Sequence, residues 1–445
     1  MKRKLKLSVM LTATTMFAFG YSFVTSKTAE AIFGVNAYIS VSSGGTKGNA
    51  ASTAPDISLD GRYIVFSSSA TNLVSGDTNG FGDVFLRDTF LDTTTRVSVD
   101  STGTQSNGGS SSAKISGNGK FIFYASSATN LVSGDTNASS DIFKYDVING
   151  TTTRVSVDST GTQSNGGSSN PDPDATGRFV VFETSSTNLA MTDTNANSDV
   201  VLKDSTAGTT TYMSQSDTGV LGNGGNGYFP PKISCDGRFV LFASGSSNLV
   251  ASDTNGFNDV FLTDMLGTRM ITNITLGGNG TSYGGDLSCD GRYLIYSSDA
   301  SNQIASDTNG QGDTFRYDRL TSTKQRANIK EDGAAPSDGA GPVTISADGR
   351  FIVFYTTSGN YTTTTTDSNN KRDLFLRDMT TNTIKIVSMN TTGTTANNES
   401  AFRGSISGGN RVVFSSIATD LISGDTSTED VFTVDGGPAG TCIVE

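Results

Sequence analysis

Short apolar runs alternate with long polar loops along most of this chain. The clearest copy begins with the apolar run Arg62–Ser67 (RYIVFS), passes through a polar loop and enters a second run at Asp83–Asp88 (DVFLRD). A third run, Thr94–Val99 (TTRVSV), alternates polar and apolar positions, as a half-exposed strand does. The first run is apolar without alternation, which predicts a strand covered on both faces. The pattern therefore indicates β-strands.

The polar loop carries a motif that the chain repeats. Its first copy, starting at Gly76, reads GDTNGFGDVFLRD. The leading aspartates are 54 to 60 residues apart: Asp77, Asp135, Asp193, Asp253, Asp307, Asp367 and Asp425. Self-similarity at a fixed period of this size indicates repeated supersecondary units.

Each repeat supplies four strands, which is typical of a β-propeller blade. In the first repeat we expect a short first strand at Ile57–Ser58 and a tight turn at Asp60–Gly61 with positive φ at both residues. Consecutive strands are antiparallel, so the D-T-N loop and the loop to the next repeat should emerge on one face. Long loops on a rigid scaffold are where binding usually takes place.

The two ends of the chain complement each other. The last repeat supplies three strands, the third at Asp430–Val434, and no fourth. The segment around Tyr38–Val41 resembles the missing outer strand. We therefore predict an all-β, seven-bladed β-propeller of four-stranded blades over residues 32–445, with the last blade closed by the N-terminal strand. Such closure removes an open sheet edge.

The run S-x-D-G-R-Y-I-V-F followed by D-V-F-L-R-D resembles the blades of TolB-like (WD-repeat-like) propellers. The resemblance covers essentially the whole mature chain and implies the propeller fold. This chain lacks the proline that the family places before Asp-Gly, and it adds the D-T-N loop. TolB has an extra N-terminal domain without a counterpart here, so its partner-binding role is not carried over. Propellers of this kind serve as binding modules, scaffolds and enzymes, so the resemblance does not decide the activity.

The first 31 residues have the features of a secretory signal peptide. A basic start, Met1–Lys6, precedes the apolar run Leu7–Val24, and Ala29–Ala31 offers a small-x-small cleavage site. An uncleaved membrane anchor is the alternative. We expect an exported protein, periplasmic or extracellular, that is monomeric and has no membrane span in the mature chain.

Composition excludes several functions. The net charge of -12 argues against nucleic acid and anionic membranes as partners. The chain has no histidine, which removes Ser-His-Asp catalysis and the usual zinc and copper sites. Among its three cysteines, Cys235 and Cys289 occupy equivalent places in neighbouring repeats, and whether they pair stays open.

The D-T-N loop is the one constellation that suggests a ligand. Its carboxylate and amide oxygens suit Ca²⁺. The competing interpretation is that these residues cap turns through hydrogen bonds to the backbone. The candidate metal ligands are Asp77, Asn79, Asp83, Asp135, Asn137, Asp141, Asp193, Asn195, Asp199, Asp253, Asn255, Asp259, Asp307, Asn309, Asp313, Asp367, Asn369 and Asp373. We expect these six loops to behave alike and the shorter seventh loop, from Asp425, to be weakest.

Two other repeated features are expected to be structural. An asparagine five residues before most loop aspartates, such as Asn72 and Asn130, should hold the long loop through backbone hydrogen bonds. The aspartate that ends the third strand, such as Asp88, and the basic residue after the turn glycine, such as Arg62, also recur.

The sequence favours a binding or interaction module with a protein or glycan partner on the loop-rich face. The alternative is a polysaccharide-active hydrolase or lyase that uses carboxylates of this face. Catalysis needs carboxylates that break the repeat. Glu183 and Glu331 do so, yet nothing in the sequence pairs them. We assign no catalytic or cofactor-binding residue.

Overall fold

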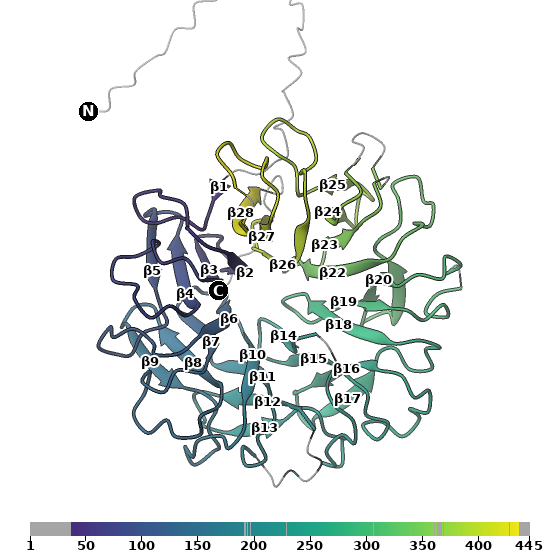
Figure 1. Cartoon of the computed structure of the whole chain (residues 1–445). Coiled ribbons are helices and arrows are strands. Elements are labelled where there is room, and N and C mark those ends of the chain that lie inside the picture. The colour runs from purple at the N-terminus through teal and green to yellow at the C-terminus, as the bar shows by residue number, and fades with distance from the viewer. Residues whose placement is uncertain are drawn as a thin grey trace, which may run out of the picture. The chain divides into compact units, whose positions relative to one another are not determined.

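Seven antiparallel sheets of four strands each surround a common centre, as Figure 1 shows. The computed structural model describes residues 37–435 except 191, 192, 194, 196, 228, 306, 360, 363–366, 368 and 427, and it leaves out the side chains of 401 and 402. The described residues contain no helix. The predicted all-β, seven-bladed propeller is thereby confirmed. The predicted signal peptide and Cys442 lie outside the described residues.

Each blade has an inner, a second, a third and an outer strand, and we number the blades 1 to 7 along the chain. The inner strands are β2 (Ser52–Ile57), β6 (Ser110–Ile115), β10 (Ser168–Pro173), β14 (Lys232–Ile233), β18 (Ser282–Leu287), β22 (Ala340–Ile345) and β26 (Ser400–Ile406). The second strands are β3 (Tyr63–Ser68), β7 (Phe121–Ser126), β11 (Phe179–Thr184), β15 (Phe239–Ser244), β19 (Tyr293–Ser298), β23 (Phe351–Thr356) and β27 (Arg411–Ser416).

The third strands all begin and end with aspartate. They are β4 (Asp83–Asp88), β8 (Asp141–Asp146), β12 (Asp199–Asp204), β16 (Asp259–Asp264), β20 (Asp313–Asp318), β24 (Asp373–Asp378) and β28 (Asp430–Asp435). The outer strands are β5 (Thr93–Arg96), β9 (Thr151–Arg154), β13 (Thr210–Tyr212), β17 (Met270–Asn273), β21 (Thr323–Arg326), β25 (Ile384–Ile386) and, for blade 7, β1 (Ala37–Tyr38).

Blade 7 is closed by the N-terminal strand, as predicted. β1 pairs antiparallel with β28, with Tyr38 opposite Phe432. The contact continues beyond the strand, because Ile39 donates its backbone N–H to the carbonyl of Val431 at 2.9 Å. Ile39 is buried in an apolar cluster that also contains residues of blade 1. The N-terminal segment thus joins the last blade to the first.

The core lies between neighbouring blades. One cluster joins Val65 and Val84 of blade 1 to Ile122, Tyr124 and Phe143 of blade 2. Both faces of a blade are covered in this way, which explains why the second and third strands are apolar without alternation. Burial on both faces is what the continuous runs predicted.

The turn between the inner and second strands differs from the prediction. Only Gly61 has positive φ (75°), while Asp60 does not. The backbone N–H of Gly61 bonds to the carbonyl of Ser58, and the Asp60 carboxylate accepts the N–H of Arg62. The turn is therefore centred on Leu59 and Asp60 and followed by a left-handed glycine, a longer connection than the expected two-residue turn.

Two strand boundaries also differ from the prediction. The inner strand β2 spans six residues, Ser52–Ile57, rather than a short edge at Ile57. Its first residues contain no run of large apolar side chains that would mark a strand, although four of its six residues are buried. The outer strand β5 ends at Arg96, although Val97 and Val99 beyond it are buried.

The recurrent asparagine holds the loops, as predicted. Asn130 accepts the backbone N–H of Asn107 at 2.9 Å and donates to the carbonyl of Gln105 at 2.8 Å. Asn72 makes the same two bonds to Asn49 and Lys47. Each asparagine thus joins the loop after a second strand to the loop entering its own blade.

Cys235 and Cys289, in the turns of blades 4 and 5, form a disulfide with Cα atoms 4.5 Å apart. The backbone N–H of Cys235 also bonds to the carbonyl of Cys289. The pairing that the sequence left open is therefore present. In the described part of the chain, no helix is long and apolar enough to cross a membrane.

Candidate functional site

The D-T-N loops show the hydrogen bonds of capped turns. In blade 1 the side-chain carbonyl of Asn79 accepts the backbone N–H of Phe81 at 2.9 Å. The amide nitrogen of Asn79 points to the Asp83 carboxylate at 3.2 Å. The other oxygen of Asp83 accepts the hydroxyl of Ser98 at 2.5 Å. These contacts are the ones that the turn-cap interpretation expects, and calcium binding by the loops stays a prediction.

The loop aspartate and the first aspartate of the third strand face a side chain of the outer strand. In blade 5 the Arg326 guanidinium lies 2.8 Å from Asp307 and 3.1 Å from Asp313. Arg96 in blade 1 and Arg154 in blade 2 hold the same position at 3.4 to 3.7 Å from their carboxylates. An internal cation thus compensates part of the negative charge of the buried carboxylate pair in these blades.

In blades 4 and 7 other side chains contact the buried aspartate pair. In blade 4 the Asn273 amide donates to Asp259 at 3.0 Å. In blade 7 the Lys47 ammonium, which comes from the following loop, lies 3.0 Å from Asp425 and 2.7 Å from Asp430.

Blades 3 and 6 have apolar or aromatic residues at the position of these donors. The register places Tyr212 of blade 3 and Ile386 of blade 6 where blade 1 has Arg96. Burial raises the pKa of Asp199 in blade 3 to about 6, and the Asp193 carboxylate adds to the shift.

Blade 6, like blade 3, has buried carboxylates with raised pKa values. Burial raises the pKa values of Asp367 and Asp373, and the Asp367 carboxylate adds to the rise for Asp373. Each of these two blades therefore holds a pair of buried carboxylates without a cation from its own outer strand.

The centre of the ring contains a belt of alternating charge. The last residue but one of the inner strand is Asp56, Lys114, Asp172, Lys232, Asp286, Thr344 and Ser405 in blades 1 to 7. Lys114 bonds to Asp56 at 3.2 Å, and Lys232 bonds to Asp172 at 3.0 Å. The alternation of charge ends at blade 5, where Asp286 accepts the hydroxyl of Thr344 at 2.7 Å, and blade 7 has the uncharged Ser405.

Between this belt and the loop-rich face lies an apolar channel of about 360 Å³. Its wall includes the prolines and aromatic rings of the inner half of the blades: Pro55, Pro171, Phe229, Pro230, Pro342 and Tyr355. A cavity lined mostly by apolar groups with a few convergent charges is the usual form of a ligand site.

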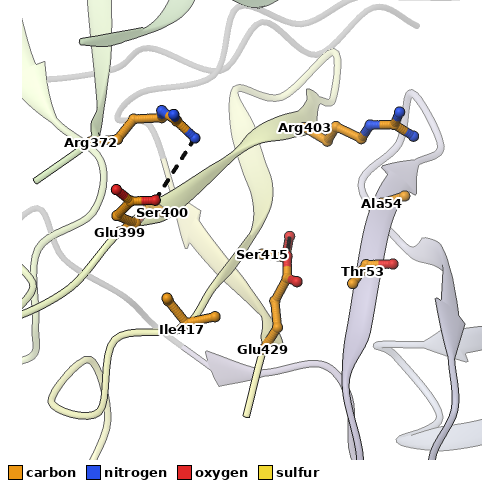
Figure 2. Close-up of a pocket in the computed structure, with 9 residues that line it drawn as sticks. All are labelled: Thr53, Ala54, Arg372, Glu399, Ser400, Arg403, Ser415, Ile417 and Glu429. Atoms are coloured by element: carbon orange, nitrogen blue, oxygen red, sulfur yellow. Dashed lines mark hydrogen bonds and ion pairs between the residues drawn. The ribbon is translucent and has the colours of Figure 1, made fainter. Parts of the chain in front are cut away.

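A second pocket of about 380 Å³ opens beside the channel at blades 6, 7 and 1, and we call it the channel mouth. It is lined by Thr53, Ala54, Arg372, Glu399, Ser400, Arg403, Ser415, Ile417 and Glu429. Figure 2 shows Arg372 and Glu399 on one side and Arg403 and Ala54 on the other. Ala54, Arg372 and Arg403 also line the channel, so the two cavities adjoin each other.

The charged residues of the channel mouth break the repeat. Arg372 and Glu429 precede the third strands of blades 6 and 7, where blades 1 to 5 have Gly82, Ser140, Ser198, Asn258 and Gly312. Glu399 precedes an inner strand, where the other blades have Ala51, Gly109, Gly167, Gly225, Thr281 and Gly339. Asymmetry of this kind is what a site for one ligand requires.

The charged residues of the channel mouth differ in their contacts with the rest of the chain. Arg372 lies 3.9 Å from Glu399, a long ion pair. Glu429 accepts the hydroxyl of Ser415 at 2.7 Å. Arg403 is exposed and makes no hydrogen bond or ion pair within the described part of the chain. The channel mouth thus offers both arginine and glutamate side chains to a ligand.

The sequence analysis did not identify this site. Glu183 and Glu331, which it singled out, lie elsewhere: Glu183 accepts the amide of Asn170 at 2.7 Å, and Glu331 accepts the N–H of Ile384 at 2.8 Å. Comparing the residue before each third strand across the repeats would have pointed to Arg372 and Glu429. Only the ring geometry shows that these two residues line the same pocket as Glu399.

Solved structures share the fold at low sequence identity. An oligogalacturonate lyase from Vibrio parahaemolyticus is 12% identical, with a TM-score of 0.51 and 91% of each chain covered. An acylaminoacyl peptidase from Pyrococcus horikoshii is 9% identical, with a TM-score of 0.52, 87% of this chain covered and 51% of the peptidase. TolB from Acinetobacter baumannii is 17% identical, with a TM-score of 0.39 and coverage of 85% and 82%.

No family model and no curated protein matches this sequence. At these identities the structural similarity shows the propeller fold alone. Membership of the TolB-like repeat family stays a prediction.

Proposed function

We propose that this chain is an exported β-propeller that acts as a binding module and takes its ligand at the channel mouth. The observation that carries the proposal is the group of charged residues Arg372, Glu399, Arg403 and Glu429, which have no counterpart in the other blades. They stand over an apolar channel, so the site combines an apolar floor with a charged rim.

This combination suits a ligand with an apolar body and ionic groups at one end. A protein segment can place an aromatic or aliphatic side chain in the channel and its charged neighbours at the rim. A glycan with carboxylate substituents can stack a sugar face on Tyr355 and direct the carboxylate to Arg403. In either case the partner approaches from the loop-rich face.

An array of short peptides and oligosaccharides, probed with the mature protein, tests this proposal. Ligands found on the array are titrated by calorimetry into wild type, Arg403→Ala and the control Lys120→Ala. Lys120 is an exposed cation on the short-turn face. We expect Arg403→Ala to raise Kd at least about tenfold, since one charge-assisted contact contributes roughly 1.4 kcal/mol or more. Equal binding by both variants, or no ligand on the array, would count against the channel mouth.

A polysaccharide hydrolase or lyase is the second candidate, because Glu399 and Glu429 line the same pocket. Paired carboxylates are the groups that glycoside cleavage uses. The oligogalacturonate lyase among the similar structures gives a substrate class to try, although it shares only the fold. Release of reducing or unsaturated ends from a polyuronate, lost in Glu429→Gln, would establish this alternative over simple binding.

A further inference from the structure

We propose that the apolar channel takes a linear dianion, a small ligand with a carboxylate or phosphate group at each end of an apolar body. One end lies at Arg372 and Arg403 of the channel mouth. The other lies at Lys114 and Lys232, which form the floor of the channel at the belt. This inference rests on the proposed function, and it adds the floor contact and the chemical class of the ligand.

The charged residues that line the channel are all cationic. They are Arg372, Arg403, Lys114 and Lys232, and no aspartate or glutamate lines the channel among the residues that the structure describes. The chain as a whole carries a net charge of -12, so its composition does not favour a cationic wall. Complementary charge steers a ligand and selects it. A cationic wall in an acidic protein therefore indicates an anionic ligand.

The aspartates of the belt do not line the channel, and their oxygens accept hydrogen bonds within the chain. One oxygen of Asp56 accepts the backbone N–H of Ile115 at 2.9 Å, and the other faces Lys114 at 3.2 Å. Asp172 and Asp286 accept a backbone N–H in the same way, at 3.0 and 3.2 Å. These carboxylates are thus turned towards the blades, and the lysines are the belt residues that a ligand meets.

The two lysines keep donors for a ligand. An ammonium group has three N–H donors. Lys114 donates to Asp56 and Lys232 donates to Asp172, and neither has another acceptor in the described residues. The lysine side chains are 22% and 16% exposed. Burial opposes the charge of Lys232, but the carboxylates of Asp172 and Asp286 outweigh this effect and raise its pKa above the ordinary value. The floor therefore presents cationic N–H groups to the channel.

The inner strand that carries Lys114 is bent in the channel wall. Ser112 has a φ of 54°, and the pairing of β6 with β7 shifts register between Ser111 and Lys114. Blades 1 and 3 have the same left-handed residue at Ala54 and Asn170, which also line the channel. Bulges of this kind change the direction of the side chains that follow, and backbone strain gathers at functional sites. The bend is thus placed where it sets the direction of the floor lysine.

The floor and the mouth are far enough apart for a ligand with two charged ends. The backbone carbonyl of Arg372 accepts the N–H of Ser400, the first residue of β26, so Arg372 lies level with the loop-rich end of the inner strands. Lys114 is the fifth residue of β6, which places it roughly 13 Å deeper at about 3.3 Å per residue. Apolar groups such as Phe229 and Pro342 line the channel between these levels. A ligand that reaches both ends needs an apolar middle.

Titration of aliphatic dicarboxylates of increasing length into the full-length mature protein tests the proposal. Each is compared by calorimetry, at low salt, with the monocarboxylate and the diamine of the same length. We expect the affinity to rise at the length that spans the channel, to at least about tenfold above the monocarboxylate, because a second charge-assisted contact is made. The diamine should not bind.

Variants that remove charges in pairs test the floor. Asp56→Asn combined with Lys114→Met, and Asp172→Asn combined with Lys232→Met, leave no buried carboxylate without its lysine, and asparagine keeps the acceptor for the backbone N–H. Each double variant should lose the preference for the dicarboxylate. Lys120→Met, at the exposed cation of the short-turn face, is the matched control and should keep it. If a double variant does not fold, the length series in the wild type still decides.

The outcomes separate the floor from the mouth. Equal affinity for the monocarboxylate and the dicarboxylate at every length, no binding of any carboxylate, or a preference for the diamine would each overturn the dianion. The proposed function would stand in these cases if Arg403→Ala still weakened the binding of a ligand found on the array. A preference for the dicarboxylate that survives in both double variants would likewise overturn the assignment of Lys114 and Lys232.

Discussion

Arg62 and Asp88 form a two-point ion pair at the short-turn end of blade 1, with the guanidinium nitrogens Nε and Nη2 3.0 and 2.6 Å from the two carboxylate oxygens. The pair lies within one blade, because Arg62 immediately precedes β3 and Asp88 ends the neighbouring β4. The same arrangement recurs as Arg178–Asp204, Arg238–Asp264, Arg292–Asp318 and Arg350–Asp378, while Arg411 contacts Asp435 through Nε alone. The carboxylate also caps the next turn, for Asp88 accepts the N–H of Phe90.

These pairs predict a loss of stability in acid. The Arg178 guanidinium lowers the pKa of Asp204 to about 2, below its ordinary value near 3.8. A carboxylate whose pKa is lowered by folding stabilises the protein above its unfolded pKa, and this contribution is lost as the pH falls from about 4 to about 2. Asp204→Asn should therefore lower the urea midpoint at pH 7. The difference from wild type should disappear towards pH 2.

The control for this measurement is Asp332→Asn. Asp332 is exposed in a loop, and its carboxylate accepts the N–H of Ala334. Urea unfolding followed by circular dichroism from pH 7 to 2.5 gives both curves. A constant gap between Asp204→Asn and wild type over that range would show that the ion pair does not contribute.

Ring closure predicts a strong dependence on Ile39. Its side chain is 3% exposed and packs in the cluster between blades 7 and 1. Ile39→Ala should lower the free energy of unfolding by about 2–4 kcal/mol, because it leaves a cavity in a packed interface. Ile148→Ala, at a position that is 73% exposed, is the matched control and should have little effect. Thermal unfolding of both variants decides whether the N-terminal segment closes the ring in solution.

The disulfide between blades 4 and 5 should contribute to stability outside a reducing compartment. It closes a loop of 54 residues between Cys235 and Cys289. Cross-links over such loops typically stabilise by about 2–4 kcal/mol. Chemical denaturation with and without a reductant measures the effect. The Cys235→Ser, Cys289→Ser double variant should show the lower value under both conditions, and a reductant effect that persists in it would exclude this bond as the cause.

The asparagine that joins two loops should behave as a paired hydrogen-bonding group. Asn130→Ala leaves the N–H of Asn107 and the carbonyl of Gln105 without their partner, which should cost about 1–3 kcal/mol. Asn130→Asp keeps the acceptor and should be milder. Blade 7 already has this form, for Asp420 accepts the N–H of Asn397. Equal losses in the two variants, measured by thermal unfolding, would show that the acceptor contributes little.

The sequence by itself determined the number of blades, the closure of the last blade and the loop-rich face. These features depend on local patterns, such as the run from Tyr63 to Ser68, repeated at a constant period. It also indicated that Asn72 holds a loop, because a short polar side chain there acts on nearby backbone. The inner strands were shortened in the prediction because residues such as Ser52 and Thr53 lack the apolar signal of a packed strand.

Only the tertiary structure decided which residues share a site. Glu399 and Glu429 lie in different loops, and Arg372 comes from another blade, so their meeting at the channel mouth depends on how blades 6 and 7 are placed. Tyr212 occupies the Arg96 position of the sequence repeat, but only the structure shows that this position faces the aspartate pair. Identical aspartate pairs therefore contact a cationic side chain in some blades and not in others, because the facing residue lies on a neighbouring strand, outside the D-T-N motif.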